Sequence, residues 1–354
     1  MLSILDRYIG RSILITSLLV LLVLVALASI FGFIAELEDV GKGSYSLGKA
    51  MQYVLLTIPS KAYLLFAPSV LLGSLLGLGT LATYSELIVM RAAGVSNGRI
   101  IRSVVIAGLA LMVAVGLLGE FAVPKAEQVA EQVRLTALEK RISVRGNNGL
   151  WVKSDSRFVN ISTVMPNLTL LGLVIWEYDD NNLTRSLTVE KAEPVSEGWK
   201  LTGLNITEFE NDGSNVKRVE NEVWSSLVSA RVLQALSISP ESLSLKNLRG
   251  QVEYLKTNGL DSERIELAFW IKLTSPLATL VMLMLSLPFV FGSQRSGGAG
   301  QKIFIGIMLG IGYVLLNKLL THLGLTYGFS PAFSALLPLL LFFFISIVGI
   351  QNIS

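Results

Sequence analysis

Six long apolar stretches dominate this sequence and limit its fold more than any other feature. Each is close to the roughly 20 residues that an α-helix needs to cross the hydrocarbon core of a bilayer. Three stretches precede a long polar region and three follow it. They cover residues 12–35, 62–85, 103–124, 273–294, 303–321 and 331–350. The sequence therefore predicts six transmembrane helices, in the arrangement three plus three.

The composition agrees with a membrane protein. Charged residues make up 16% of the chain, whereas a soluble domain carries roughly 25%. Arg7 and Arg11 precede the first stretch, and the Ala-Leu-Ala sequence at residues 26–28 resembles a signal-peptide cleavage site. The apolar run continues past that sequence to Ile34, so we expect an uncleaved first helix.

The orientation of the helices follows from the short loops, because Lys and Arg accumulate on the cytoplasmic side. One side carries seven basic residues: Arg7, Arg11, Arg91, Arg99, Arg102, Arg295 and Lys302. The other side carries three, Lys42, Lys49 and Lys61, offset by the acids Glu36, Glu38 and Asp39. We therefore expect a multi-pass inner-membrane protein with both termini in the cytoplasm and the long polar region in the periplasm.

That polar region changes from helical patterns to short alternating segments rich in β-branched and aromatic residues, which indicate strands. The expected strands are residues 158–161, 173–178, 199–206 and 216–228, with turn residues between them at 179–182, 197–198 and 211–214. Helical spacing from Leu245 to Leu255 then predicts a return helix over about 244–258, stopped by Asn258-Gly259, with Asp261 capping the fourth span.

The fold class is accordingly an α+β membrane protein, with a periplasmic β-jelly-roll or sandwich domain inserted between the third and fourth spans. The expected boundaries are 1–124 for the first three spans, 125–265 for the β domain with its return helix, and 266–354 for the last three spans.

Several kinds of chemistry have no residues to support them. The chain has no cysteine and one histidine, which argues against thiolate or histidine metal sites and against a catalytic triad. The glycines of residues 292–297 have the spacing of a phosphate-binding loop, but Gly298 stands where the lysine is required. Basic residues are dispersed, so a nucleic-acid partner is not expected. We expect a non-enzyme that draws energy from a partner or from an ion gradient.

Charged residues within the spans do not favour ion coupling. Glu120, Lys272 and Lys318 all fall near the periplasmic ends of their spans. Buried acids at the middle of the bilayer would be expected in an ion-coupled carrier.

The cytoplasmic loop at residues 83–94 predicts a short helix. Thr83 and Glu86 have the spacing of a capping box, and Gly94 is a typical C-terminal stop. Such a helix would offer Leu87 and Met90 for docking into a groove on a partner. The alternative, left open by the pattern, is that Glu86 only caps a helix on the membrane surface.

An ordered series of short motifs runs through the whole chain. It comprises LDRYIG at 5–10, GSY at 43–45, LLGLG at 75–79, SEL at 85–87 continuing to Gly94, GE at 119–120 before Pro124, Tyr254-Leu255, Gly259, Lys272, Pro276-Leu277 and residues 289–292. Through these motifs the chain resembles the LptF/LptG family of lipopolysaccharide transport permeases.

The resemblance implies a permease subunit of an ABC transporter. Two such permeases pair and bind two copies of the ATPase LptB, and the complex extracts lipopolysaccharide from the periplasmic leaflet of the inner membrane. The lipid then passes along a jelly-roll bridge through LptC and LptA toward the outer membrane. No cofactor is expected in this chain, because ATP and magnesium bind to the ATPase. The resemblance also implies a coupling helix, with these ATPase-coupling residues: Glu86, Leu87, Met90, Arg91 and Gly94.

A phosphorylated substrate makes basic residues at the outer rim candidate contacts. These are Lys42, Lys61, Lys272 and Lys318, each with the alternative of reaching to any anionic lipid. Trp176 and Phe158 are candidates for lining a lipid slot in the β domain, with an ordinary sandwich core as the alternative. Three other functions stay open: the sister permease of the pair, an ABC-type protein that transmits motion without moving lipid, and a membrane-anchored scaffold.

Overall fold

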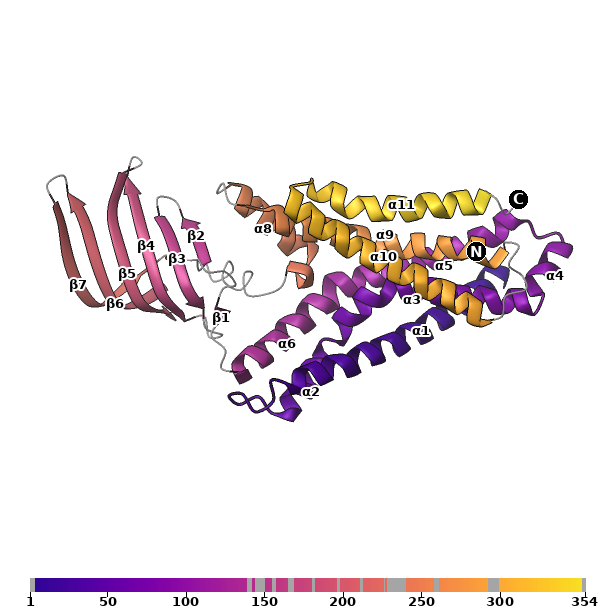
Figure 1. Cartoon of the computed structure of the whole chain (residues 1–354), viewed down its shortest axis with the longest axis horizontal. Coiled ribbons are helices and arrows are strands. Elements are labelled where there is room, and N and C mark those ends of the chain that lie inside the picture. Colours follow the sequence, from indigo (N-terminus) through magenta and orange to yellow (C-terminus); the bar gives the residue numbers. More distant parts are fainter. Residues whose placement is uncertain are drawn as a thin grey trace. The chain divides into compact units, whose positions relative to one another are not determined.

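The protein is described here by a computed structural model (Figure 1). It describes residues 4–138, 142–143, 150–154, 157–164, 169–179, 182–195, 198–210, 213–225, 227, 240–257, 261–291 and 299–351. The chain divides into two compact units. The first, which we call the span unit, comprises Met1–Ala35, Val54–Glu127 and Pro240–Ser354. The second comprises Glu36–Tyr53 and Gln128–Ser239. The glycine-rich residues 292–298 and the expected stop at Asn258-Gly259 lie outside the described residues.

Six helices in the described part of the chain are long and apolar enough to cross a membrane, which confirms the predicted number of spans. They are α1 (Ile4–Leu37), α3 (Ile58–Thr83), the continuous run Asn97–Leu138, α9 (Glu263–Phe291), α10 (Ala299–Tyr327) and α11 (Pro331–Gln351). The short helices α2 (Leu47–Leu56) and α4 (Glu86–Ala92) lie before and after α3 in the chain.

The spans differ in how deeply they are buried within the span unit. Of the most apolar 18 residues, 78% are buried in α3 and 56% in α9, against 6% in α1 and 11% in α10. The central pair therefore forms the core, while α1 and α10 present most of their apolar surface outward.

Helices α1 and α3 approach closely at two glycines. A Cβ atom at Gly73 would lie 2.3 Å from the Cα of Ser17, and one at Gly77 would lie 2.6 Å from the hydroxyl of Thr16. The Thr16 hydroxyl donates to the Gly73 carbonyl at 2.7 Å. Gly73 and Gly77 form a G-x-x-x-G pattern, which lets helix backbones meet inside a bilayer.

The third span does not end at Pro124, as expected, but continues as one helix. It consists of α5 (Asn97–Leu117), the π-helical turn η1 (Leu118–Ala122) and α6 (Val123–Leu138). Pro124 has no N–H to donate, and the helix passes it by a π turn in which the Val123 N–H reaches back to the Leu118 carbonyl. The expected boundary at 124/125 thus lies inside a helix.

The chain re-enters the span unit through the turn η2 (Pro240–Ser242) and α8 (Leu245–Thr257), within the range expected for the return helix. Leu248 is buried on one face of α8. Asp261 accepts a hydrogen bond from the Glu263 N–H at 2.9 Å, so it caps α9 as predicted.

The second unit contains one antiparallel sheet, in the order β1-β3-β4-β5-β6-β7, with β2 also paired to β3 (Figure 1). The strands are β1 (Ile142–Ser143), β2 (Leu150–Ser154), β3 (Arg157–Val164), β4 (Leu170–Asp179), β5 (Asn182–Val195), β6 (Gly198–Glu210) and β7 (Gly213–Trp224). Four of the expected strands are present, and β5 is the longest one that the pattern missed.

A crease crosses this sheet. Gly172 in β4 and Gly203 in β6 have φ of 61° and 70°, and both stand in the row of Glu190 in β5. The phase of buried residues shifts by one across this row, from Leu170 to Leu173 in β4 and from Leu201 to Leu204 in β6. Glycine adopts the left-handed backbone conformation without steric cost, so these two positions let the strands change direction.

The creased sheet curves so strongly that side chains of distant strands meet. The Arg157 guanidinium of β3 lies 4.8 Å from the ring centre of Trp224 in β7. Three strands separate β3 from β7, and neighbouring strands lie about 4.8 Å apart, so a flat sheet would hold them roughly 19 Å apart. The expected β domain is therefore present, and within the described residues it is one strongly curved antiparallel sheet.

Candidate functional site

Helix α4 begins in an unexpected way. Ser85, its N-cap residue, has φ of 59° and makes no side-chain cap. The Thr83 hydroxyl donates to the Gly79 carbonyl of α3 at 2.8 Å. The predicted capping box between Thr83 and Glu86 is wrong, because Thr83 still belongs to the preceding helix.

Glu86 instead fixes α4 to the first span. Its carboxylate accepts a hydrogen bond from the Tyr8 hydroxyl of α1 at 2.6 Å. The sequence interval of 78 residues between the two made this contact invisible to pattern reasoning. Glu86 therefore binds a residue of α1, whereas the sequence pattern had suggested only a helix-capping role for it.

The two faces of α4 have different surroundings. Leu87 is buried and belongs to the core of the span unit, and Met90 packs against that core. The prediction that Leu87 is offered to a partner is therefore wrong, since its side chain points inward. Three apolar side chains at α4 point outward: Ile88 and Val89 within the helix, with exposed fractions of 52% and 65%, and Tyr84 in the turn just before it, with 76%. We call these three residues the outer face of α4.

The end of α4 is tightly built. Gly94 has φ of 87°, and its N–H donates to the Arg91 carbonyl at 3.0 Å. The Val95 N–H donates to the Met90 carbonyl at 3.1 Å. Ser96 then caps α5 by accepting from the Arg99 N–H at 3.4 Å. Gly94 is the stop that the sequence predicted, and Arg91 is exposed in the last turn, where a cation favours the helix dipole.

The rolled sheet has one apolar face, which we call the inner face. Its core residues are Val159, Ile161, Leu170, Leu173, Ile175, Leu187, Val189, Ala192, Trp199, Leu201 and Leu204, joined by Leu227. At one end of this face a row of charges crosses four strands, with Arg157 on Glu177 at 2.7 Å and Arg185 on Glu208.

Trp176 and Phe158 do not belong to the inner face. They pair across β3 and β4 in register with Ser186 of β5, on the side opposite to Ile175. Trp176 stacks on Trp151 with ring centres 5.1 Å apart. Trp176 and Phe158 therefore lie on the face opposite the apolar core, and their contact with lipid stays a prediction.

Three of the four candidate lysines, Lys42, Lys61 and Lys318, are exposed or partly exposed in this structure. Lys42 is exposed and pairs with Asp39 at 2.7 Å. Lys61 of α3 reaches α1 at Gly32, where an added Cβ would lie 2.8 Å from its ammonium nitrogen. Lys318 is exposed on α10.

Lys272 is different, because only 5% of it is exposed. Its ammonium group donates to the Leu243 carbonyl and lies 5.9 Å from the ring centre of Tyr63. In this structure the Lys272 ammonium group is therefore turned inward, and its contact with substrate stays a prediction. A lysine that reaches the membrane interface needs a free path for its side chain. Here the segment between η2 and α8 binds the ammonium group through the Leu243 carbonyl.

Sequence reasoning missed Arg134 on α6. Its guanidinium donates to Glu36 at 3.0 Å and to Asp39 at 2.9 Å, and lies 5.3 Å from the ring centre of Tyr53. The buried Tyr45 hydroxyl also donates to Glu36, at 2.8 Å. Burial, and then this bond, raise the pKa of Tyr45 above its usual range, so its hydroxyl stays a donor in alkaline solution as well. The sequence signal for this cluster was the pair of acids Glu36 and Asp39, which we had counted only as offsets to nearby lysines.

We expect Glu36→Ala to destabilise the second unit by about 1–2 kcal/mol, because Arg134 and the Tyr45 hydroxyl lose a shared acceptor in a partly buried cluster, while Asp39 still pairs with Arg134. Glu38→Ala is the matched control, since Glu38 lies two residues away and is exposed. The measurement is the thermal unfolding midpoint of the purified chain in detergent. Equal midpoints for the two variants would contradict a structural role for the Arg134 cluster.

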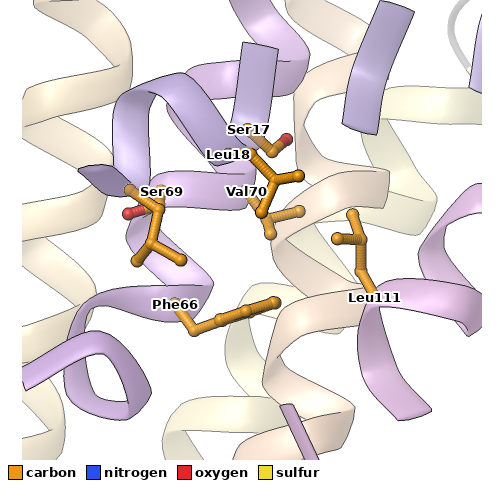
Figure 2. A pocket seen from close by; sticks show the side chains of 7 residues that line it. Ser17, Leu18, Phe66, Ser69, Val70 and Leu111 are labelled. Atoms are coloured by element: carbon orange, nitrogen blue, oxygen red, sulfur yellow. The ribbon is translucent and has the colours of Figure 1, made fainter. Parts of the chain in front are cut away.

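The described part of the chain shows no further ligand site. Among the described residues, no group of three or more His, Cys, Asp or Glu side chains is placed to hold a metal ion. A shallow crevice between α1, α3 and α5 (Figure 2) has no room for even a water molecule, so it is not a ligand pocket. It is lined by Ser17, Leu18, Leu21, Phe66, Ser69, Val70 and Leu111.

Comparison with known proteins decides the family. The profile described as "Lipopolysaccharide export system permease LptF/LptG" matches residues 7–352. The chain belongs to the LptF/LptG family. Its relatives include the lipopolysaccharide export system permease protein LptG of Escherichia coli K12, 34% identical over 98% of this chain and 97% of that protein. The LptG protein of Haemophilus influenzae is 35% identical over 97% of this chain and 96% of its own length.

Membership of the LptF/LptG family fits the arrangement found here. Six apolar helices and the family together indicate a multi-pass inner-membrane permease. The relatives named above are LptG proteins, so the alternative of the sister permease LptF gains nothing from them.

Proposed function

We propose that this chain is the LptG-type permease subunit of an ABC transporter that exports lipopolysaccharide. It pairs with an LptF-type permease and binds an LptB-type ATPase dimer in the cytoplasm. Its β domain, in the periplasm, receives lipopolysaccharide extracted from the inner membrane and delivers it to the LptC and LptA bridge. The chain itself holds no cofactor, and ATP and magnesium bind to the ATPase.

The observation that carries the coupling part of this proposal is the outer face of α4. Tyr84, Ile88 and Val89 expose an apolar surface on a helix fixed on both sides. The Glu86–Tyr8 bond holds α4 to α1, and buried Leu87 anchors it to the core. A partner that docks on the outer face therefore moves spans, because helices in lipid keep their own hydrogen bonds and behave as stiff rods. Positive loops on the α4 side support placing it in the cytoplasm.

The inner face of the β domain supports the lipid part. Acyl chains need an apolar surface out of water, and this face offers aliphatic side chains and Trp199. The charge row at one end of this face contains the guanidinium groups of Arg157 and Arg185, which suit the phosphates of the substrate. Lys61, Lys318 and Lys42 are the remaining candidate contacts at the outer rim.

The test places a photo-crosslinking amino acid at Ile206, on the inner face, or at the adjacent Thr207, on the opposite face. In membranes containing the complete transporter we expect Ile206 to capture lipopolysaccharide only when ATP is supplied, at about ten times the yield of Thr207. The factor assumes a preference of about 1.4 kcal/mol for the inner face.

Three outcomes would oppose the proposal. Capture at Ile206 without ATP favours passive binding. Absence of lipopolysaccharide with an intact ATPase complex favours a protein that transmits motion only. A chain that purifies from gentle detergent without any ATPase is a scaffold.

A further inference from the structure

The return segment from the β domain is tied to the third span by a partly buried polar contact. Glu120 lies in the π turn η1, and its carboxylate accepts the backbone N–H of Leu245 at 2.8 Å. Leu245 is the first residue of α8. The contact therefore satisfies a backbone group that a helix start otherwise leaves without a partner.

A second contact meets the same segment two residues earlier. The Lys272 ammonium group of α9 donates to the carbonyl of Leu243, which lies between η2 and α8. The opposite charges of Glu120 and Lys272 act on each other. A carboxylate on one span and an ammonium group on another thus bind the same short backbone segment, at the Leu245 N–H and at the Leu243 carbonyl. We call Glu120, Lys272 and residues 243–245 the joint.

The second span also reaches the joint. The Tyr63 hydroxyl of α3 donates to the Lys272 carbonyl at 3.4 Å. Tyr63 packs on η1 so closely that a Cβ at Gly119 would lie 2.4 Å from its ring. The π turn is what brings Glu120 here, and π turns inside α-helices often mark functional positions.

The second and third spans, which both reach the joint, are also the two spans that α4 connects. Helix α3 ends at Thr83, just before α4, and α5 begins at Asn97, just after it. The connection from α4 to α5 is short and hydrogen-bonded at Gly94, Val95 and Ser96. Helix α5 then runs 21 residues to η1, which at about 1.5 Å per residue is roughly 30 Å. Both spans that flank α4 therefore end at the joint.

We propose that Glu120 and Lys272 form a mechanical joint that passes movement of the α4-bearing spans to the segment leading back from the β domain. This inference rests on the proposed transport function and assigns a positioning role to these two residues. Burial of Lys272 and the capping of α8 make the return segment follow η1 and α9 as one body.

The test compares Glu120→Ala, Glu120→Gln and Lys272→Met in the complete transporter. Two quantities are measured in each: the ATPase rate, and lipopolysaccharide captured at Ile206 per ATP hydrolysed. We expect Glu120→Ala and Lys272→Met to keep an ATPase rate within twofold of the parent and to lose about tenfold in capture per ATP. Glu120→Gln keeps an acceptor for the Leu245 N–H and should recover most of the capture.

The controls separate this inference from the proposed function. If the parent transporter captures nothing with ATP, the proposed function fails. If the parent captures lipopolysaccharide and Glu120→Ala captures as much per ATP, the joint is refuted. If Glu120→Ala and Lys272→Met lower the ATPase rate, the amount of complex and the capture in parallel, the contacts only support folding, which also refutes the joint.

Discussion

Val89→Asp is expected to remove the partner ATPase from the purified transporter while leaving the chain folded. Val89 is 65% exposed on the outer face of α4, so the substitution costs little in the chain alone. In a docked complex the new carboxylate would be buried against an apolar surface without a partner. Residues at the centre of an interface cost about 2 kcal/mol or more when disrupted, which is roughly a 30-fold loss of affinity.

The matched control is Val216→Asp in β7, because Val216 is also 65% exposed. Both variants add the same charge to the same residue type. Copurified ATPase is quantified against the tagged chain on stained gels, with Ile88→Asp as a second variant on the outer face. If ATPase stays bound to Val89→Asp and Ile88→Asp, α4 is not the docking helix.

Gly73→Val is expected to separate α1 from α3 and to be the most destabilising single change among the spans. The added Cβ would lie 2.3 Å from the Ser17 Cα and 2.5 Å from its nitrogen, and these are backbone atoms that no side-chain rotation can move. Overpacking of a well-packed site costs about 1–3 kcal/mol, and we place this variant at about 3 kcal/mol, because the helix must shift as a whole.

Gly312→Val provides the control, since Gly312 also lies within a spanning helix and a Cβ there meets nothing within 4 Å. The change in helix propensity is the same at both positions, so the difference reports packing alone. We expect Gly73→Val to lower the midpoint of heat-induced aggregation in detergent and Gly312→Val to leave it unchanged. Equal midpoints would show that α1 can withdraw from Gly73 at no cost.

The spans were predictable because the bilayer imposes one length on every helix that crosses it. The exception was the third span, where the rule that proline ends a helix failed. Pro124 is accommodated by the π turn beside it, and that turn depends on packing against Tyr63. Strand β5 was missed because Lys191, Glu193 and Pro194 interrupt its alternation. Pairing on both sides, to β4 and β6, holds that segment extended.

The candidate sites were harder to predict, because each depends on contacts between distant residues. The short helix and its stop at Gly94 are local features and were found. Which face of α4 points inward depends on the core that receives Leu87. The position of Lys272 depends on a carbonyl 29 residues earlier in the chain. Arg134 drew no notice because its acidic partners lie about a hundred residues away.

The crease through Gly172, Glu190 and Gly203 gives the β domain an easy direction of bending. A β-sheet resists bending where every residue is locked into its ladder. At this row, however, the pairing registers step from Leu171 to Leu173 and from Thr202 to Leu204. We expect the sheet to bend more readily about this row than elsewhere, and such bending would change the width of its apolar face. Backbone amides along the row should then exchange with solvent before those on either side of it.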